Sequence, residues 1–172
     1  MYKILGLNPG STSTKVSYYE DEKEVFVESI SHSADEIAKY DKIIDQFEFR
    51  KERIMEILKD KGVDVNELSC VVARGGLLPP LKAGAYKVNE AMVTLLKEKP
   101  VMEHASNLGA VIAYEIVKPL GIPAFIYDGV TVDEMMDILR VTGLKELPRR
   151  GIGHNLNTRA AAMKYAREHN KE

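Results

Sequence analysis

The 172-residue sequence predicts an α/β fold with a mixed β-sheet. Three short β-favouring runs separated by turn residues open the chain, at 2–8, 15–20 and 23–31, and this pattern is typical of an antiparallel three-strand meander. Two continuous apolar runs of strand length come later, "CVVA" at 70–73 and "PAFIY" at 123–127. Such runs are typical of buried strands that are covered on both faces. The expected fold is therefore a meander followed by helices and further buried strands.

One long amphipathic helix, bent near Phe49, is predicted directly after the meander. Ser33 opens it, Glu36 completes a capping box, and apolar residues then recur at largely helical spacing until Gly62. Four more helical segments are predicted, at 89–99, about 105–118, 133–140 and 157–169. A dinucleotide-binding fold is disfavoured, because it needs a helix after the first glycine turn and here a second strand follows.

Composition restricts the function further. A net charge of −2, a pI near 6.1, 45% hydrophobic and 29% charged residues are ordinary for a globular protein of one domain. There is no long basic stretch to follow a nucleic acid, no apolar run that could span a membrane, and no signal peptide, so a cytoplasmic protein is expected. Cys70 is the single cysteine and is interpreted as a buried, inert thiol.

The first turn, in "LGLNPGSTSTK", has the composition of an anion site. Four hydroxyl residues at 11–14 follow Gly10, and Lys15 adds a positive charge. It is not a Walker loop, since Thr14 stands where that loop needs glycine and a strand follows in place of a helix. Backbone N–H groups and hydroxyls in one tight turn suit a phosphoryl group, although a solvated hairpin would have the same composition.

Polar residues also follow both buried strands. Arg74 stands where "CVV" gives way to Gly75 and Gly76, and an arginine there can hold a carboxylate or phosphate through two parallel hydrogen bonds. Asp128 ends "PAFIYD" at the C-terminal end of a strand, where ligands of open α/β sheets gather. It could hold Mg²⁺ or act on a proton. A surface arginine and a turn-capping aspartate are the ordinary alternatives.

Two histidine-containing segments lie at expected helix starts. "HASN" contains His104 and Asn107, and "GHNLN" contains His154 and Asn157. Donors at helix N-termini suit anions, but the same residues are common helix caps.

Taken together, these motifs resemble a known family. "LGLNPGSTSTK", "VVARGGLLPP", "VNEAM", "HASNLGA", "PAFIYD" followed by "VDEM", and "GHNLN" are similar, in order and spacing, to the amino-terminal half of the butyrate kinase family. That family lies in the acetate kinase (acetokinase) branch of the sugar kinase, Hsp70 and actin superfamily. The resemblance covers essentially the whole chain. It implies a ribonuclease H-like (actin-like ATPase) domain that moves phosphate reversibly between ATP and a short-chain carboxylate.

The resemblance also implies roles for individual residues. The chain departs from the family pattern at Val71, where arginine is expected and Arg74 would substitute, and at Gly153, where an aromatic residue is expected. The implied phosphate-binding residues are Asn8, Gly10, Ser11, Ser13 and Lys15. The implied catalytic residues are Arg74, Asp128 and His154, with Mg²⁺ accompanying ATP near Asp128. Support of the substrate or of loops is implied for Gly75, Gly76, His104, Asn107 and Asn157.

The family grips ATP between two similar domains, and the second phosphate loop and the adenosine-binding glycines belong to its carboxyl-terminal half. We therefore expect residues 1–172 to be a single domain that lacks that half. The expected partners are ATP or ADP, a short-chain carboxylate or acyl phosphate, the missing half or a complementary chain, and a second copy through self-association. A non-catalytic fragment that binds phosphate or a partner is the main alternative. An activator ATPase of the acyl-CoA dehydratase type is a weaker one, because Cys70 alone cannot hold an iron–sulfur cluster.

Overall fold

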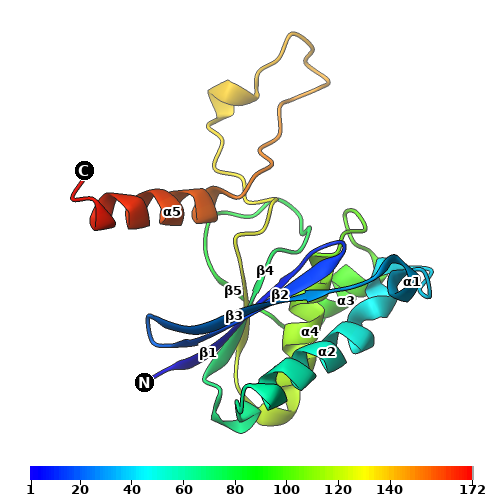
Figure 1. Ribbon diagram of the computed structural model, residues 1–172. Helices are drawn as coiled ribbons and strands as arrows, with labels where there is room; N and C mark the ends of the chain where they lie inside the picture. Colours follow the sequence, from blue (N-terminus) through cyan, green and yellow to red (C-terminus); the bar gives the residue numbers. More distant parts are fainter. Residues whose placement is uncertain (172) are drawn as a thin grey trace.

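The computed structural model describes residues 1–171, and Figure 1 shows a sheet with helices gathered mainly on one side. The strands are β1 (Lys3–Pro9), β2 (Ser13–Glu20), β3 (Lys23–Ser31), β4 (Cys70–Arg74), β5 (Tyr86–Lys87) and β6 (Ala124–Tyr127). The α-helices are α1 (Ala34–Ile37), α2 (Phe47–Asp60), α3 (Glu90–Glu98), α4 (Asn107–Val117) and α5 (Asn155–Glu168). Short 3-10 turns are η1 (Ile43–Gln46), η2 (Val65–Glu67), η3 (Lys118–Leu120) and η4 (Asp137–Arg140).

The sheet has the predicted mixed topology. Its order is β3-β2-β1-β4-β6-β5, with β1, β2 and β3 forming the expected antiparallel meander. β4 runs parallel to β1, and β6 runs parallel to β4, while the short strand β5, which the sequence did not indicate, is antiparallel to β6. Because Leu7 pairs with Ala73 and Arg74 pairs with Tyr127, the C-terminal ends of β1, β4 and β6 share one edge.

One face of the sheet is packed and the other is open. Alternate residues of the central strands are buried against helices, for example Leu5 and Leu7 of β1 and Val71 and Ala73 of β4. The other face is partly exposed, and Tyr127 of β6 is 40% exposed. The expectation that the apolar strands are covered on both faces is therefore wrong for the described residues, because the contacting helices α2 and α4 lie on one side (Figure 1).

The predicted long helix after the meander is broken. Ser33 and Glu36 form the predicted capping box, but α1 has only four residues. The backbone of Lys42 is extended (φ −120°, ψ 149°), and helical structure resumes through η1 into α2. The break is accompanied by packing of the Tyr40 ring 5.9 Å from the ring of Phe49, so tertiary contact overrides the helical spacing.

Helix α4 is the centre of the core. Nearly all of its residues are buried, as expected for a helix that is apolar on every side. It contacts β4, β6 and β1 on one side and α2 and α3 on the other. Gly109 permits this close approach, since a Cβ there would lie 3.1 Å from the Cβ of Ala73 and 3.3 Å from the Arg74 carbonyl oxygen.

A long excursion, residues 129–154, connects β6 to α5 and projects from the body (Figure 1). The helix predicted at 133–140 is wrong except for the turn η4. Asp133 accounts for this: its carboxylate accepts bonds from the Met135 N–H (3.0 Å) and from two nitrogens of Arg140 (2.7 and 3.1 Å), which closes a loop. Arg140 first, and then the Met135 N–H, lowers the pKa of Asp133.

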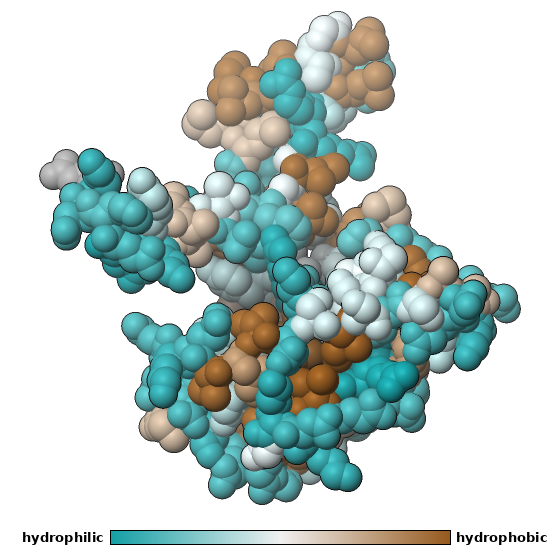
Figure 2. Space-filling model, viewed as in Figure 1, coloured by the Kyte–Doolittle hydropathy of each residue, from teal (hydrophilic) through white to brown (hydrophobic). Residues whose placement is uncertain are grey.

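The excursion carries many exposed apolar side chains, visible as brown patches at the top of Figure 2. They are Met136, Ile138, Leu139, Val141, Leu144, Leu147 and Ile152. None of the helices described for residues 1–171 combines the length and the apolar character needed to cross a bilayer.

We predict that Gly109→Ala destabilises the fold by about 1–3 kcal/mol, because the added methyl group presses α4 against the backbone of β4. Gly143→Ala is the matched control, since nothing lies within 4 Å of a Cβ at that position. Urea unfolding of both variants measures the difference. Equal midpoints for Gly109→Ala and the parent chain would contradict the close-packing argument.

We predict that the free energy of unfolding depends on pH through His32. Its ring is buried, and burial, Arg50 and Arg53 lower its pKa while Glu36 opposes this shift. The unfolded chain therefore takes up a proton at a higher pH than the folded chain, so stability is lost as pH falls from about 6.5 through the folded pKa. Urea unfolding at neutral and at mildly acidic pH tests this. In His32→Gln, the loss over that interval should shrink, and an unchanged pH profile would exclude His32 as its source.

Candidate functional site

The hairpin between β1 and β2 divides its polar residues between two faces. Asn8 and Lys15 are paired across the ladder and line the open face of the sheet. Thr14 points the other way and is fully buried, with its Oγ1 2.9 Å from Nε2 of His32. The turn is closed by a 2.7 Å bond from the Gly10 N–H to the Ser13 carbonyl oxygen. The hydroxyl residues therefore do not act as one group, since Thr14 belongs to the core.

Arg74 lies at the end of β4, before two glycines with left-handed backbones. Gly75 has φ 94° and Gly76 has φ 98°, which side chains rarely tolerate. A Cβ at Gly75 would also lie 2.8 Å from the Cβ of Ser106, so the turn packs tightly on the start of α4. The Arg74 side chain, one third exposed, donates from Nε to Oδ2 of Asp128 at 3.1 Å.

Asp128 is a buried carboxylate that accepts three hydrogen bonds and lies close to a nitrogen of His154. It is 3% exposed and has a left-handed backbone, with φ 56°. Oδ1 accepts from the N–H groups of Leu156 and Asn157, both at 3.1 Å, and thereby caps the start of α5. Oδ2 lies 3.1 Å from Arg74 Nε and 3.0 Å from Nδ1 of His154. His154 Nδ1 is also 2.9 Å from the Asp128 carbonyl oxygen. The capping interpretation of Asp128 is therefore confirmed, although the helix it caps is α5, and its functional role stays a prediction.

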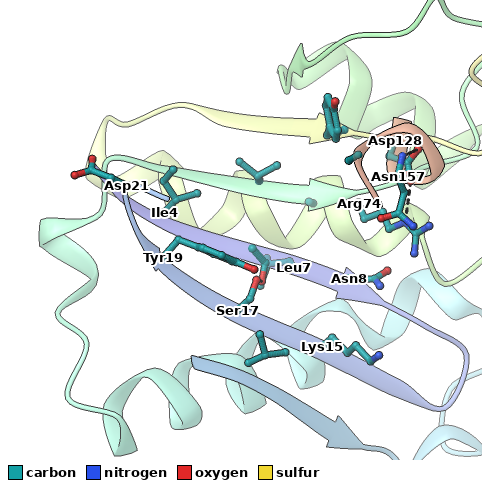
Figure 3. A pocket seen from close by; sticks show the side chains of 16 residues that line it. Ile4, Leu7, Asn8, Lys15, Ser17, Tyr19, Asp21, Arg74, Asp128 and Asn157 are labelled. Atoms are coloured by element: carbon teal, nitrogen blue, oxygen red, sulfur yellow. Dashed lines mark hydrogen bonds and ion pairs between the residues drawn. The ribbon is translucent and has the colours of Figure 1, made fainter. Parts of the chain in front are cut away.

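Two cavities meet beside these residues. The sheet-face cavity, about 560 Å³, is lined by Lys15, Asp128 and Asn157 among others, as Figure 3 shows. The excursion cavity, about 890 Å³, lies between the sheet edge and the excursion. Asn8 and Arg74 line both cavities. Asn8, Arg74 and Asp128, which stand at or directly after the C-terminal ends of β1, β4 and β6, therefore line one and the same cavity.

Only some of the other predicted site residues line these two cavities. Gly10, Gly75, His104 and His154 line the excursion cavity. Neither of these two cavities is lined by Ser11, Ser13, Gly76 or Asn107.

The side chain of Asn107 bonds to the backbone of neighbouring loops. Its Oδ1 accepts from the Leu77 N–H at 2.8 Å, and its Nδ2 donates to the Met102 carbonyl oxygen at 2.9 Å. His104 Nδ1 accepts from the Ser106 N–H at 3.1 Å and so caps the first turn before α4. Asn107 therefore fixes the loop after β4 to the start of α4, while His104 combines capping with a place on the cavity wall.

Sequence reasoning missed four arginines. Arg140, Arg149 and Arg150 line the excursion cavity, and the consecutive "RR" before Gly151 was a signal that could have been followed. Arg50 is buried beneath the hairpin. Its position four residues before Ile54, within the apolar stripe of α2, marked it as an inward-facing charge.

The described residues do not by themselves form a magnesium site. Oδ1 of Asp128 already accepts from two backbone amides and Oδ2 from Arg74, and no group of three or more acidic, histidine or cysteine side chains within residues 1–171 could hold a metal. Mg²⁺ commonly binds through one or two carboxylates together with substrate phosphates.

Relatives of known name match the whole chain. It is 49% identical to butyrate kinase 1 of Clostridium acetobutylicum over 172 residues, which are 100% of this chain and 48% of that protein. It is equally identical to butyrate kinase 2 of the same organism over 171 residues, 99% of this chain and 48% of that protein. The chain thus spans about half the length of the curated relatives it matches. No protein-family model matches it.

Solved structures show the same fold. Acetate kinase of Porphyromonas gingivalis superposes with a TM-score of 0.64 at 16% identity, covering 100% of this chain and 50% of that one. A propionate kinase of Francisella tularensis gives 0.63 at 11% identity with the same coverage. The protein therefore has the actin-like ATPase fold. Over its whole length the chain is similar to an amino-terminal half of the butyrate kinases, which confirms the resemblance inferred from its motifs.

We predict that Asp128→Asn and Asp128→Ala differ in their effect on α5. An asparagine oxygen can still accept from the Leu156 and Asn157 amides, whereas its NH₂ group would face the donors of Arg74 and His154. Amide exchange should show Leu156 and Asn157 protected in the asparagine variant and about fivefold less protected in the alanine variant, because a helix cap contributes about 1 kcal/mol. Equal protection in both variants would show that Asp128 does not hold the helix.

Proposed function

We propose that this chain is the phosphate-binding and acceptor-binding lobe of a butyrate kinase. The reaction moves the γ-phosphoryl group of MgATP to a carboxylate oxygen of butyrate or a similar short-chain acid, giving acyl phosphate and ADP, and it is reversible. The observation that carries the proposal is the meeting of Asn8, Arg74 and Asp128 where two cavities join. A cytoplasmic location belongs to the same proposal.

The residues around the junction suit a transferring phosphoryl group. Phosphoryl transfer depends mainly on positioning and on stabilisation of charge spread over the phosphoryl oxygens. Asn8, Lys15 and the Gly10 turn would supply donors at the junction, and Ser11 and Ser13, which line neither cavity, would supply them from the tip of the hairpin. Arg74 would clamp the anion while Asp128 fixes its guanidinium from behind. His154, 40% exposed, would donate to the phosphoryl oxygens from the excursion side.

The excursion cavity suits the acyl acceptor. Its wall combines positive groups near Arg74 with apolar side chains, a combination that can bind a carboxylate and a short alkyl chain together. The apolar contributors are Leu77, Pro80, Val101, Met102, Val130 and Ile152. His104 and the Gly75 turn lie on the same wall, and Asn107 and Gly76 shape the loop behind it. Asn157 faces the other cavity.

Residues 1–172 would form one domain of a two-domain kinase. In this proposal adenine and ribose contacts come from the other half, and closure of the two halves excludes water from the transferring group. The open sheet face and the exposed apolar excursion are surfaces that a second half, or a second copy of the chain, could cover.

A non-catalytic role is the second candidate function. In this role the chain binds phosphate or a partner without turnover, and the half-length match to the relatives favours it.

The proposal predicts that the 172-residue chain alone does not turn over. Acyl phosphate formed from butyrate and MgATP can be trapped with hydroxylamine and measured. Adding the half of the C. acetobutylicum enzyme that this chain does not match should restore turnover, because that half would complete the nucleotide site. Robust turnover by the chain alone would show that a second domain is unnecessary, and continued absence after complementation would favour the non-catalytic role.

In the complemented enzyme we predict different effects for residues at the junction. Asn8→Ala and Asp128→Ala should lower kcat by about 100-fold or more with little change in KM, because their contacts strengthen in the transition state. Arg74→Ala should also raise the KM for the carboxylate. Steady-state kinetics measures all three. Near-normal turnover in Asp128→Ala would remove that residue from the catalytic set.

A further inference from the structure

Arg50 is a buried arginine held under the phosphate-facing hairpin. It lies on α2, is 1% exposed, and reaches across to the turn between β1 and β2. Nη1 donates to the carbonyl oxygens of Gly10 (2.7 Å) and Ser13 (3.3 Å) and to Oγ1 of Thr14 (3.1 Å). Nη2 donates to the Ser11 carbonyl oxygen at 3.1 Å. The guanidinium thus binds three carbonyl groups of one turn.

The positive charge of Arg50 has no negative partner. The remaining bonds go to the neutral Gln46, whose Oε1 accepts from Nη2 at 2.8 Å and from Nε at 3.1 Å. Among the ion pairs found within residues 1–171, none includes Arg50, whereas Arg74 is paired with Asp128. A buried charge without a counter-ion is costly unless dipoles solvate it, and here the carbonyl groups of the hairpin do so.

This arrangement orients the hairpin backbone. The carbonyl oxygens of Gly10, Ser11 and Ser13 point inward to Arg50, and the Thr12 carbonyl oxygen accepts from the His32 N–H at 2.9 Å. In the part of the chain that the structure describes, the N–H groups of Ser11 and Thr12 donate to no protein acceptor. They are therefore free to meet an anion at the tip of the turn.

We propose that Arg50 is a positioning residue that makes the hairpin an anion site: it fixes the carbonyl groups inward and leaves its own charge uncompensated behind the turn. The inference rests on the proposed phosphate-binding function and adds the source of its positive potential. Charges interact strongly at short range where water is excluded, so a full charge directly beneath the turn attracts an anion through the backbone. The surface charge of Lys15 is screened more by salt.

The variant Gln46→Glu tests the charge while keeping the geometry. Glutamate has the same shape and can accept the same two bonds from Arg50, but it neutralises the guanidinium. The control Lys59→Gln changes net charge by the same amount at an exposed position of α2, 13 residues or about 20 Å further along by helical rise. Calorimetric titration with inorganic phosphate at low salt should give about tenfold weaker binding for Gln46→Glu and no more than about twofold for Lys59→Gln.

The variant Arg50→Lys tests the positioning. It keeps the charge, but a lysine ammonium cannot span all the acceptors that the planar fork reaches. Amide exchange should rise about tenfold at Gly10 and His32, whose N–H groups bond within the turn, while the amides of α4 stay protected. Unchanged exchange at the turn would overturn the positioning role, as would loss of protection throughout α4, which would make Arg50 a general support of the fold.

The outcomes separate this inference from the proposed function. If the parent chain binds phosphate and Gln46→Glu binds it equally tightly with unchanged thermal stability, the charge role of Arg50 is wrong and the phosphate site stands. If the parent chain shows no saturable phosphate binding at millimolar concentrations, the proposed phosphate site is wrong and this inference falls with it.

Discussion

The arrangement of the candidate site depends on the groups around the Asp128 carboxylate, which are three hydrogen-bond donors and a nitrogen of His154. Through them a single carboxylate joins the ends of β4 and β6, the end of the excursion and the first turn of α5. A buried carboxylate is stable only when donors replace its lost hydration, so these segments must meet for the chain to fold. The left-handed backbone of Asp128, with φ 56°, aims the side chain back at Arg74 and at α5. The same bonds that stabilise the fold therefore place Arg74 at the junction of the cavities.

The two buried or partly buried arginines near the hairpin have opposite surroundings. Arg74 is paired with a carboxylate, so the pair adds little net charge and provides a fixed, directional donor surface. Arg50 is solvated by neutral dipoles, so its charge remains. The junction thus combines orientation from one arginine with electrostatic potential from the other, and Lys15 adds a second, solvent-screened charge.

The sequence predicted the parts of this structure that depend on local chemistry. The meander, the two apolar strands and the cap at Ser33 are set by alternation, composition and side-chain bonds to nearby backbone. Arg74 and Asp128 were identified as candidate site residues from their places after the two buried strands. The broken helix before Phe47, the loop closed by Asp133 and Arg140, and the open sheet face were not predictable in this way, because they depend on contacts between distant segments or on which elements cover a face. Arg50 was missed because an arginine in an apolar stripe is usually assigned to the surface.

On the proposed function, these features divide the requirements of phosphoryl transfer between those that this chain meets and those that it leaves to another domain. Donors, a clamped arginine and a positive potential already meet at one edge of the sheet. Exclusion of water is different, because the sheet-face cavity is bounded by an uncovered face and the excursion exposes its apolar side chains. Electrostatic stabilisation of a transferring group is strongest where water is absent, so a second wall over this edge would increase the effect of every donor already in place. On the proposed function, positioning is a property of this lobe, and catalytic strength depends on what closes over it.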